Sequence, residues 1–73
     1  MITVKCFARY RALLGFAELR MPVVPTLADL LTDPRLTLLP KDALLAVNQS
    51  FADRATPLAE GDEVALMPPV SGG

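Results

Sequence analysis

The sequence contains no histidine, no tryptophan and only one cysteine, Cys6. Without histidine, the Ser-His and Cys-His pairs that activate many catalytic nucleophiles are absent. A lone cysteine excludes an internal disulfide, and no group of residues has the spacing of metal ligands. We therefore expect no metal site, no bound cofactor and no catalytic centre in this chain on its own.

Long apolar runs and an excess of basic charge are also missing. Seven basic and eight acidic residues give a net charge of −1, which argues against nucleic-acid binding. The longest apolar stretch, residues 43–47, is far too short to span a bilayer, and the N-terminus has no signal-peptide pattern. We expect a cytoplasmic protein that binds neither nucleic acid nor a membrane.

Apolar residues are abundant for so short a chain. Counted with glycine and without tyrosine, they make up about 56% of the sequence, against roughly 45–50% in average domains. A chain of 73 residues forms one small domain, and such a domain has a small core. We infer an exposed apolar patch, which on a small protein usually marks a binding partner.

The pattern of apolar and polar residues predicts four strands. These strands span residues 2–6, 17–21, 43–47 and 63–67. In the first strand alternate side chains face inward, including Cys6, and the same alternation directs Phe7 towards solvent. The third strand is apolar throughout, so we expect it to be covered on both faces.

Two helical segments are expected between these strands. Residues 9–14 predict a short turn that Gly15 closes in the left-handed conformation. Thr26 and Asp29 form a variant of the capping box, which predicts the start of a second helix. We expect Pro34 to end that helix and residues 35–42 to form a connection. The buried stripe of this helix is expected to consist of Leu27, Leu30 and Leu31.

The expected element order is β-β-α-β-β. The first two strands pair as a hairpin, and the last strand pairs in parallel with the first through a long crossover. This arrangement is an α+β fold, the β-grasp or ubiquitin-like roll, in which one main helix packs across a mixed sheet. We expect a single domain over residues 1–73, with residues 68–73 as an extended C-terminal tail.

The tail ends in two glycines and begins with two prolines, Pro68 and Pro69. Each proline fixes φ and lacks an N–H, so the preceding strand cannot continue through Pro68. Fully extended, residues 68–73 reach about 20 Å, and the last two carry no side chain to obstruct a narrow channel. We predict that the Gly73 carboxylate is the reactive site. The residues inserted behind it are Gly72, Ser71 and Val70.

A partner-binding patch is predicted near the start of this tail. Phe7 and Met67 lie on the outward side of neighbouring strands, and Phe51 follows the third strand closely enough to join them. Pro68 continues the same edge. The alternative is that the twist of a small sheet buries one or two of these side chains.

Three segments resemble the small, sulfur-carrier subunit of molybdopterin synthase. Residues 61–73 resemble its C-terminus, residues 7–15 its first strand and turn, and residues 46–49 its third strand. The sequence departs from the family in its short helix, interrupted by Pro34. It also has Leu66 and Met67 where relatives often carry aromatic residues.

This resemblance implies a reaction cycle. An activating enzyme of the ubiquitin-activating type would adenylate the Gly73 carboxylate, using ATP that this chain does not bind itself. A sulfur donor would then convert the acyl adenylate to a thiocarboxylate. A large synthase subunit, in a heterotetramer with this chain, would transfer the sulfur to the precursor cyclic pyranopterin monophosphate. The family contact with that subunit uses apolar residues at positions matching the predicted patch.

Other functions remain open at this stage. The chain could carry sulfur to the thiazole of thiamine or to a tRNA base, or be attached to lysines as a ubiquitin-like modifier. It could also be a β-grasp binding module whose terminus is inert. The Pro68-Pro69 pair favours molybdopterin synthesis over thiamine synthesis, because the comparable thiamine carriers usually lack it.

Overall fold

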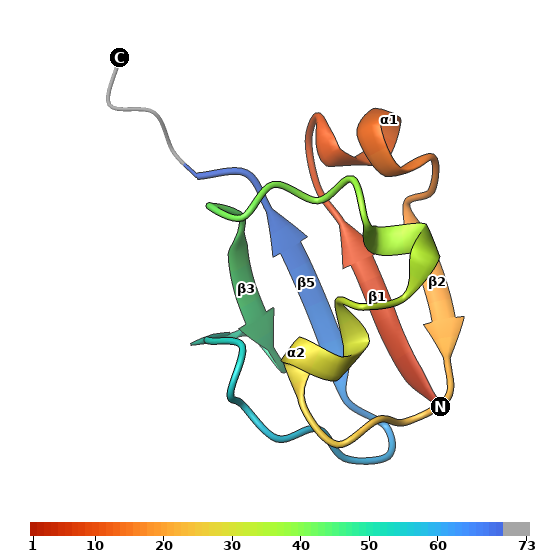
Figure 1. The fold of residues 1–73 in the computed structure, drawn as a ribbon, viewed down its shortest axis with the longest axis vertical. Coiled ribbons are helices and arrows are strands. Elements are labelled where there is room, and N and C mark those ends of the chain that lie inside the picture. The colour runs from red at the N-terminus through yellow and green to blue at the C-terminus, as the bar shows by residue number, and fades with distance from the viewer. Residues whose placement is uncertain (70–73) are drawn as a thin grey trace.

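The computed structural model describes residues 1–69 of the chain, and five strands in them form one mixed sheet (Figure 1). The strands lie in the order β2-β1-β5-β3-β4. Their bounds are Ile2–Cys6 for β1, Glu18–Met21 for β2, Leu44–Val47 for β3, Ser50–Ala52 for β4 and Glu63–Met67 for β5. Only β1 and β5 pair in parallel, while the other pairs are antiparallel.

The expected α+β β-grasp fold is therefore confirmed. The parallel pair β1 and β5 occupies the middle of the sheet, with Val4 opposite Val64 and Cys6 opposite Leu66. These four side chains are at most 2% exposed, because they face the layer of helices that crosses one side of the sheet (Figure 1). The start of β1 and the end of β5 lie at opposite ends of this central pair (Figure 1).

Helix α1, Tyr10–Leu14, ends as the sequence predicts. Gly15 has a φ of 86°, and its N–H donates to the Arg11 carbonyl at 2.9 Å. Tyr10, which stands between two arginines in the sequence, is only 1% exposed. Sequence reasoning missed this core residue because a tyrosine beside charged neighbours does not stand out as buried.

Helix α2, Leu27–Leu30, begins with a complete capping box. The Asp29 N–H donates to Thr26 Oγ1 at 3.3 Å, and the Thr26 N–H donates to Asp29 Oδ2 at 3.2 Å. Leu27 and Leu30 are fully buried, while Leu31 is half-buried against the core. No helix within residues 1–69 has the length and apolar character needed to cross a membrane.

The second helix ends before Pro34 as expected, but the proline has a further role that the sequence analysis missed. Helix α2 ends at Leu30, before the proline, and Pro34 instead begins a 3₁₀ helix, η1, Pro34–Leu36. A proline suits that first position because its missing N–H has no helical partner there. This turn buries Leu36, at 2% exposure, so the segment expected to be a plain connection contributes to the core.

The sequence analysis also missed strand β4. Asn48 and Gln49 have φ values of 51° and 70°, so a two-residue turn of the kind favoured in hairpins joins β3 to β4. None of the four predicted strands includes residues 50–52. A strand of three residues is too short to show alternation, and pairing with β3 defines it.

Candidate functional site

The predicted reactive tail starts where β5 ends. Met67 pairs with Leu44 of β3 as the last residue of the ladder, and Pro68 and Pro69 follow as half-buried residues outside the sheet. The chain thus leaves the end of β5 beside β3 (Figure 1). The remaining predicted tail residues, Val70, Ser71, Gly72 and Gly73, lie outside the described residues.

Beside this point, three residues of the predicted patch come together around one surface hollow. Phe7, Phe51 and Met67 line a hollow of about 320 Å³. Phe7 is 39% exposed and Phe51 79% exposed, so the sheet does not bury either ring. Pro68 lies next in the chain but does not line the hollow. The other lining residues are Ala46, Gln49, Glu63 and Ala65.

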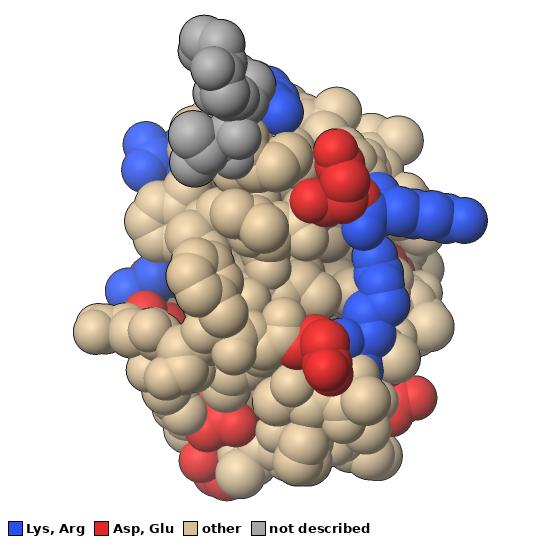
Figure 2. Space-filling model, turned by 90° about the vertical axis from the view of Figure 1, so that its left-hand side faces the viewer, with Lys and Arg blue, Asp and Glu red and all other residues tan. Residues whose placement is uncertain are grey.

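The register of the strands explains why this hollow exists. Ala46 of β3 lies opposite Phe51 of β4 on one side and Ala65 of β5 on the other. The two alanines leave little side-chain bulk between larger neighbours. The larger side chains therefore stand around a shallow apolar floor on the sheet face away from the helices. Figure 2 views the molecule from the side of β3 and β4 and shows a broad uncharged surface there.

The side chain of Asn48 fixes the hairpin that carries Phe51. Its Nδ2 donates to Asp62 Oδ1 at 2.9 Å, and its Oδ1 accepts from the Glu63 N–H at 3.0 Å. The backbone N–H of Asn48 also donates to the Glu63 carbonyl at 2.8 Å. These bonds attach the turn to the start of β5 and so hold β4 in register with the rest of the sheet face that carries the hollow.

Charged groups border the hollow along one edge. Lys5 Nζ lies 3.1 Å from Glu63 Oε2, with the two side chains 36% and 39% exposed. The Asn48 amide and the Ala59 N–H both donate to Asp62, and these bonds lower the pKa of its carboxyl below the ordinary 3.8. Asp62 thus serves as a turn charge and Glu63 as a strand-edge charge, each with a partner of its own.

Cys6 lies on the opposite side of the sheet from the hollow. It is 2% exposed, and burial raises the pKa of its thiol. A high pKa and lack of access both reduce thiolate reactivity. The cysteine therefore acts as a core residue, as its inward parity indicates.

The chemistry available at the hollow is binding rather than proton transfer. Among residues 1–69, Glu63 is the only ionisable residue that lines the hollow, and an ion pair with Lys5 already engages this carboxylate. Within residues 1–69, no cluster of three or more cysteine and acidic side chains could hold a metal ion. The hollow offers shape and apolar area to a partner.

Sequence reasoning did not include Ala46 and Gln49 in the patch. Ala46 lies on the same sheet face as Ala65, but an alanine in an apolar run gives no sign that it forms the floor of a hollow. Gln49 reaches the hollow only because the tight turn folds β4 back along β3. Both positions follow from strand register, which the sequence pattern left undefined.

Comparison with known proteins gives matches along almost the whole chain. The model of the ThiS family matches residues 4–73. Small archaeal modifier protein 1 (SAMP1) of Haloferax volcanii matches in two crystal structures. One has 28% identity and a TM-score of 0.84 over 99% of this chain and 98% of that chain. The other has 25% identity and a TM-score of 0.81 over 94% and 97%.

Two further structures are related to molybdopterin synthesis by name. A putative molybdopterin converting factor, subunit 1, from Pyrococcus furiosus has 28% identity and a TM-score of 0.77, covering 94% of this chain and 97% of that chain. A complex of subunits 1 and 2 of the molybdopterin-converting factor from Helicobacter pylori has a matching chain with 26% identity and a TM-score of 0.68. Coverage there is 99% of this chain and 97% of that chain.

Proposed function

The chain belongs to the ThiS family of small ubiquitin-like sulfur carriers, and from this premise we propose that it is the sulfur-carrier subunit of a molybdopterin synthase. The observation that carries the proposal is the position of the apolar hollow, which adjoins the exit of the tail from β5. A partner that covers the hollow receives the tail at the same time. Similarity to molybdopterin converting factor subunit 1 supports this pathway among those the family serves.

The proposed reaction begins at the Gly73 carboxylate. A carboxylate oxygen attacks the α-phosphorus of ATP on an activating enzyme, which forms the acyl adenylate and releases pyrophosphate. A sulfur donor then supplies a sulfur nucleophile to the carbonyl carbon, and AMP leaves with the electron pair of the broken C–O bond. This activation is required because a bare carboxylate is a poor electrophile and lacks a good leaving group.

The proposed partner in the final step is the large subunit, in a heterotetramer with this chain. Phe7, Phe51 and Met67 supply an apolar surface of the kind that anchors protein interfaces. The tail that follows Pro68 carries no charged side chain. The two glycines at its end let it enter a narrow channel. The large subunit supplies the catalytic groups, and the thiocarboxylate supplies the sulfur for the pterin precursor.

A second candidate function is attachment to other proteins as a ubiquitin-like modifier. Similarity to small archaeal modifier protein 1 favours it, and it uses the same activated Gly73. The two functions differ in the group that attacks the activated carbonyl: a sulfur nucleophile for the carrier and an amine for the modifier. Sulfur transfer for thiamine or tRNA differs only in the final acceptor.

The test begins with activation. We expect the intact chain, after incubation with ATP, sulfide and its activating enzyme, to gain the mass that corresponds to one oxygen replaced by sulfur. Deletion of Gly73 should abolish this gain while leaving the circular dichroism spectrum unchanged. Absence of the gain in the intact chain would rule out the carrier function.

The second step identifies the acceptor. The chain that bears the Gly73 thiocarboxylate, mixed with a large subunit and cyclic pyranopterin monophosphate, should produce molybdopterin. The chain that bears the ordinary carboxylate should not. Transfer to a thiazole or tRNA acceptor in place of the pterin would contradict the molybdopterin assignment but not the carrier function.

A further inference from the structure

The chain contains three amines, and their surroundings differ. The N-terminal amine of Met1 forms an ion pair with Glu60, and Lys5 forms one with Glu63 at 3.1 Å. Lys41, the other lysine of the sequence, is exposed and makes no ion pair with any residue in the described range 1–69. Among the carboxylates of residues 1–69, none forms an ion pair with the Lys41 amine.

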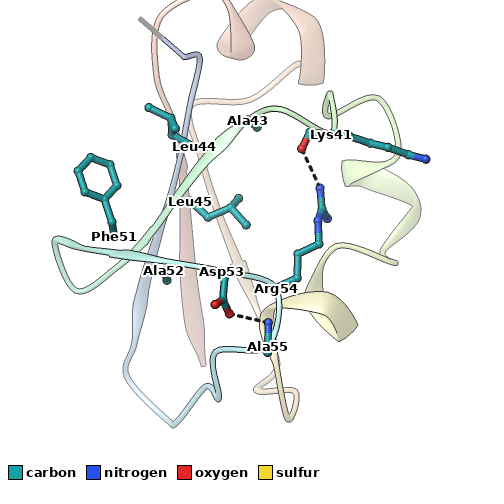
Figure 3. Close-up of a pocket in the computed structure, with 9 residues that line it drawn as sticks. All are labelled: Lys41, Ala43, Leu44, Leu45, Phe51, Ala52, Asp53, Arg54 and Ala55. Atoms are coloured by element: carbon teal, nitrogen blue, oxygen red, sulfur yellow. Dashed lines mark hydrogen bonds between the residues drawn. The ribbon is translucent and has the colours of Figure 1, made fainter.

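The two lysines also lie on different surfaces. Lys5 pairs with Glu63, which lines the proposed docking hollow, so a partner seated on the hollow restricts access to this amine. Lys41 precedes β3 and borders a second hollow, which shares Phe51 with the first. Figure 3 shows that its side chain extends away from that hollow while its carbonyl faces Arg54. Lys41 thus stays accessible when the docking hollow is covered.

The hollow beside Lys41 forms where the pairing of β3 and β4 ends. The last pair is Leu45 with Ala52, and the chain then turns towards α2, where the Ala28 N–H donates to the Arg54 carbonyl at 2.8 Å. Arg54 Nη2 donates to the Lys41 carbonyl at 3.3 Å and ties the base of the lysine to this turn. The result is an open, largely apolar hollow of about 650 Å³. The Lys41 backbone at its border is held by the hydrogen bond from Arg54.

This surface suits the C-terminal tail of another copy. Residues 67–73 contain no charged side chain, and their first four are apolar, as are six of the nine residues that line the hollow. The terminal carboxylate carries the only charge of the tail. Activation replaces the carboxylate with a bond to AMP, so the remaining negative charge lies on the phosphate of the leaving group. The apolar residues that begin the tail then meet the apolar surface that Lys41 borders.

We infer that Lys41 is the site at which this chain accepts the activated Gly73 of a second copy, giving a dimer joined by an isopeptide bond. The inference rests on the proposed activation of Gly73. The neutral Lys41 amine attacks the carbonyl carbon of the acyl adenylate, a C–N bond forms, and the C–O bond to AMP breaks. AMP leaves with the electron pair, and the nitrogen loses a proton to solvent.

The test separates the acceptor from the activation step. The donor is the chain prepared with a thioester at Gly73 and with Lys5→Arg and Lys41→Arg substitutions, so that it has no lysine of its own. The acceptor lacks Gly72 and Gly73 and cannot donate. Acceptors carry the native lysines, Lys41→Arg, or Lys5→Arg as the matched control, and circular dichroism checks that each is folded.

We expect linked dimer from the native and Lys5→Arg acceptors and loss of the dimer from the Lys41→Arg acceptor. Because Arg54 is the last basic residue, trypsin should leave donor residues 55–73 attached to Lys41, which mass spectrometry identifies. Linkage at Lys5 or at the N-terminal amine, or an undiminished yield from the Lys41→Arg acceptor, would overturn the inference.

A second arm uses the unmodified chain with ATP and its activating enzyme in the absence of sulfide. A dimer linked at Lys41 is expected. Adenylate without dimer would overturn the inference and leave the proposed activation intact. A Lys41 dimer from the thioester, combined with no adenylate in the enzymatic arm, would leave the acceptor assignment intact and refute the proposed function.

Discussion

Asn48 joins the β3–β4 hairpin to Asp62 at the start of β5. The Asn48 amide donates to Asp62 Oδ1 at 2.9 Å, and the same side chain accepts the Glu63 N–H at 3.0 Å. Asn48 is thereby held to two residues that follow it by 14 and 15 positions in the sequence. The position of Phe51 beside the hollow depends on this contact, because β4 has only three residues and little pairing of its own.

Replacing Asn48 with glycine should weaken this connection. Glycine tolerates the φ of 51° at this position, so the change removes the side-chain bonds without adding backbone strain. We expect a loss of about 1 kcal/mol in the free energy of unfolding, measured in urea. Hydrogen exchange at the Glu63 amide should accelerate at the same time. Unchanged exchange there would show that the side chain does not hold the turn.

Stability should fall in acid through the aspartates whose pKa values are lowered. Hydrogen bonds from Arg35 lower the pKa of Asp33 to about 2, and the bonds from Asn48 and Ala59 lower that of Asp62. Because these pKa values are lower in the folded state than in the unfolded state, the unfolded state takes up protons first as the pH falls. The stabilisation is therefore present above the ordinary 3.8 and is lost as the pH falls through the folded values.

Urea unfolding across this acidic range checks the expectation. The variants Asp33→Asn and Asp62→Asn should each lose less stability on acidification than the unsubstituted chain. An NMR titration of Asn48→Gly should show the pKa of Asp62 moving up towards its ordinary value. A variant whose acid profile matches the unsubstituted chain would exclude that aspartate as a source of the effect.

Gln49 occupies a left-handed conformation, with a φ of 70°. For a residue with a Cβ this conformation costs roughly 1–2 kcal/mol, and Asn-Gly is the preferred sequence for such a turn. Gln49→Gly should therefore raise the free energy of unfolding by about 1 kcal/mol, measured in urea. Gln49→Ala is the control and should give no gain. Equal effects of both substitutions would refute the strain explanation.

Met67 tests the proposed docking hollow. Met67→Asp places a charge at an apolar contact, and we expect at least a roughly tenfold loss of affinity for the large subunit, measured by calorimetry. Met67 is only half-buried, so the unfolding midpoint should change little. Leu38→Asp is the matched control because Leu38 is 65% exposed and lies outside the hollow. Equal losses from both variants would count against the hollow as the docking site.

Cys6 offers a control for the sulfur chemistry. Cys6→Ala should cost about 1 kcal/mol of stability, because it removes a buried side chain. The yield of thiocarboxylate at Gly73 should not change, since the buried thiol has no access to the sulfur donor. Loss of sulfur loading in a folded Cys6→Ala protein would assign this thiol a direct role in the chemistry.

Much of the fold could be predicted from local patterns. Alternation fixed the bounds of β1 and β5 because their burial follows a strict two-residue period. The capping box at Thr26 and the left-handed Gly15 were also readable, since each depends on neighbouring residues alone. Tyr10, Leu36 and β4 were missed because their burial or pairing depends on segments distant in the sequence.

The candidate site divides in the same way. Phe7 and Met67 could be assigned to the outward face from strand parity, and their meeting with Phe51 depended on a hairpin register that the pattern did not define. Ala46 and Gln49 belong to the hollow for the same reason. The predicted role of Gly73 remains a prediction, because the tail residues lie outside the described range.

The sequence by itself determined the strands with a clear two-residue period, the helix caps and the family. Its C-terminal pattern of two prolines and two glycines predicts a reactive role for the Gly73 carboxylate. The tertiary structure decided which side chains share a surface, because strand order and register bring distant residues together. It placed the apolar hollow beside the origin of the tail and left Lys41 on another surface, an arrangement that no local pattern encodes.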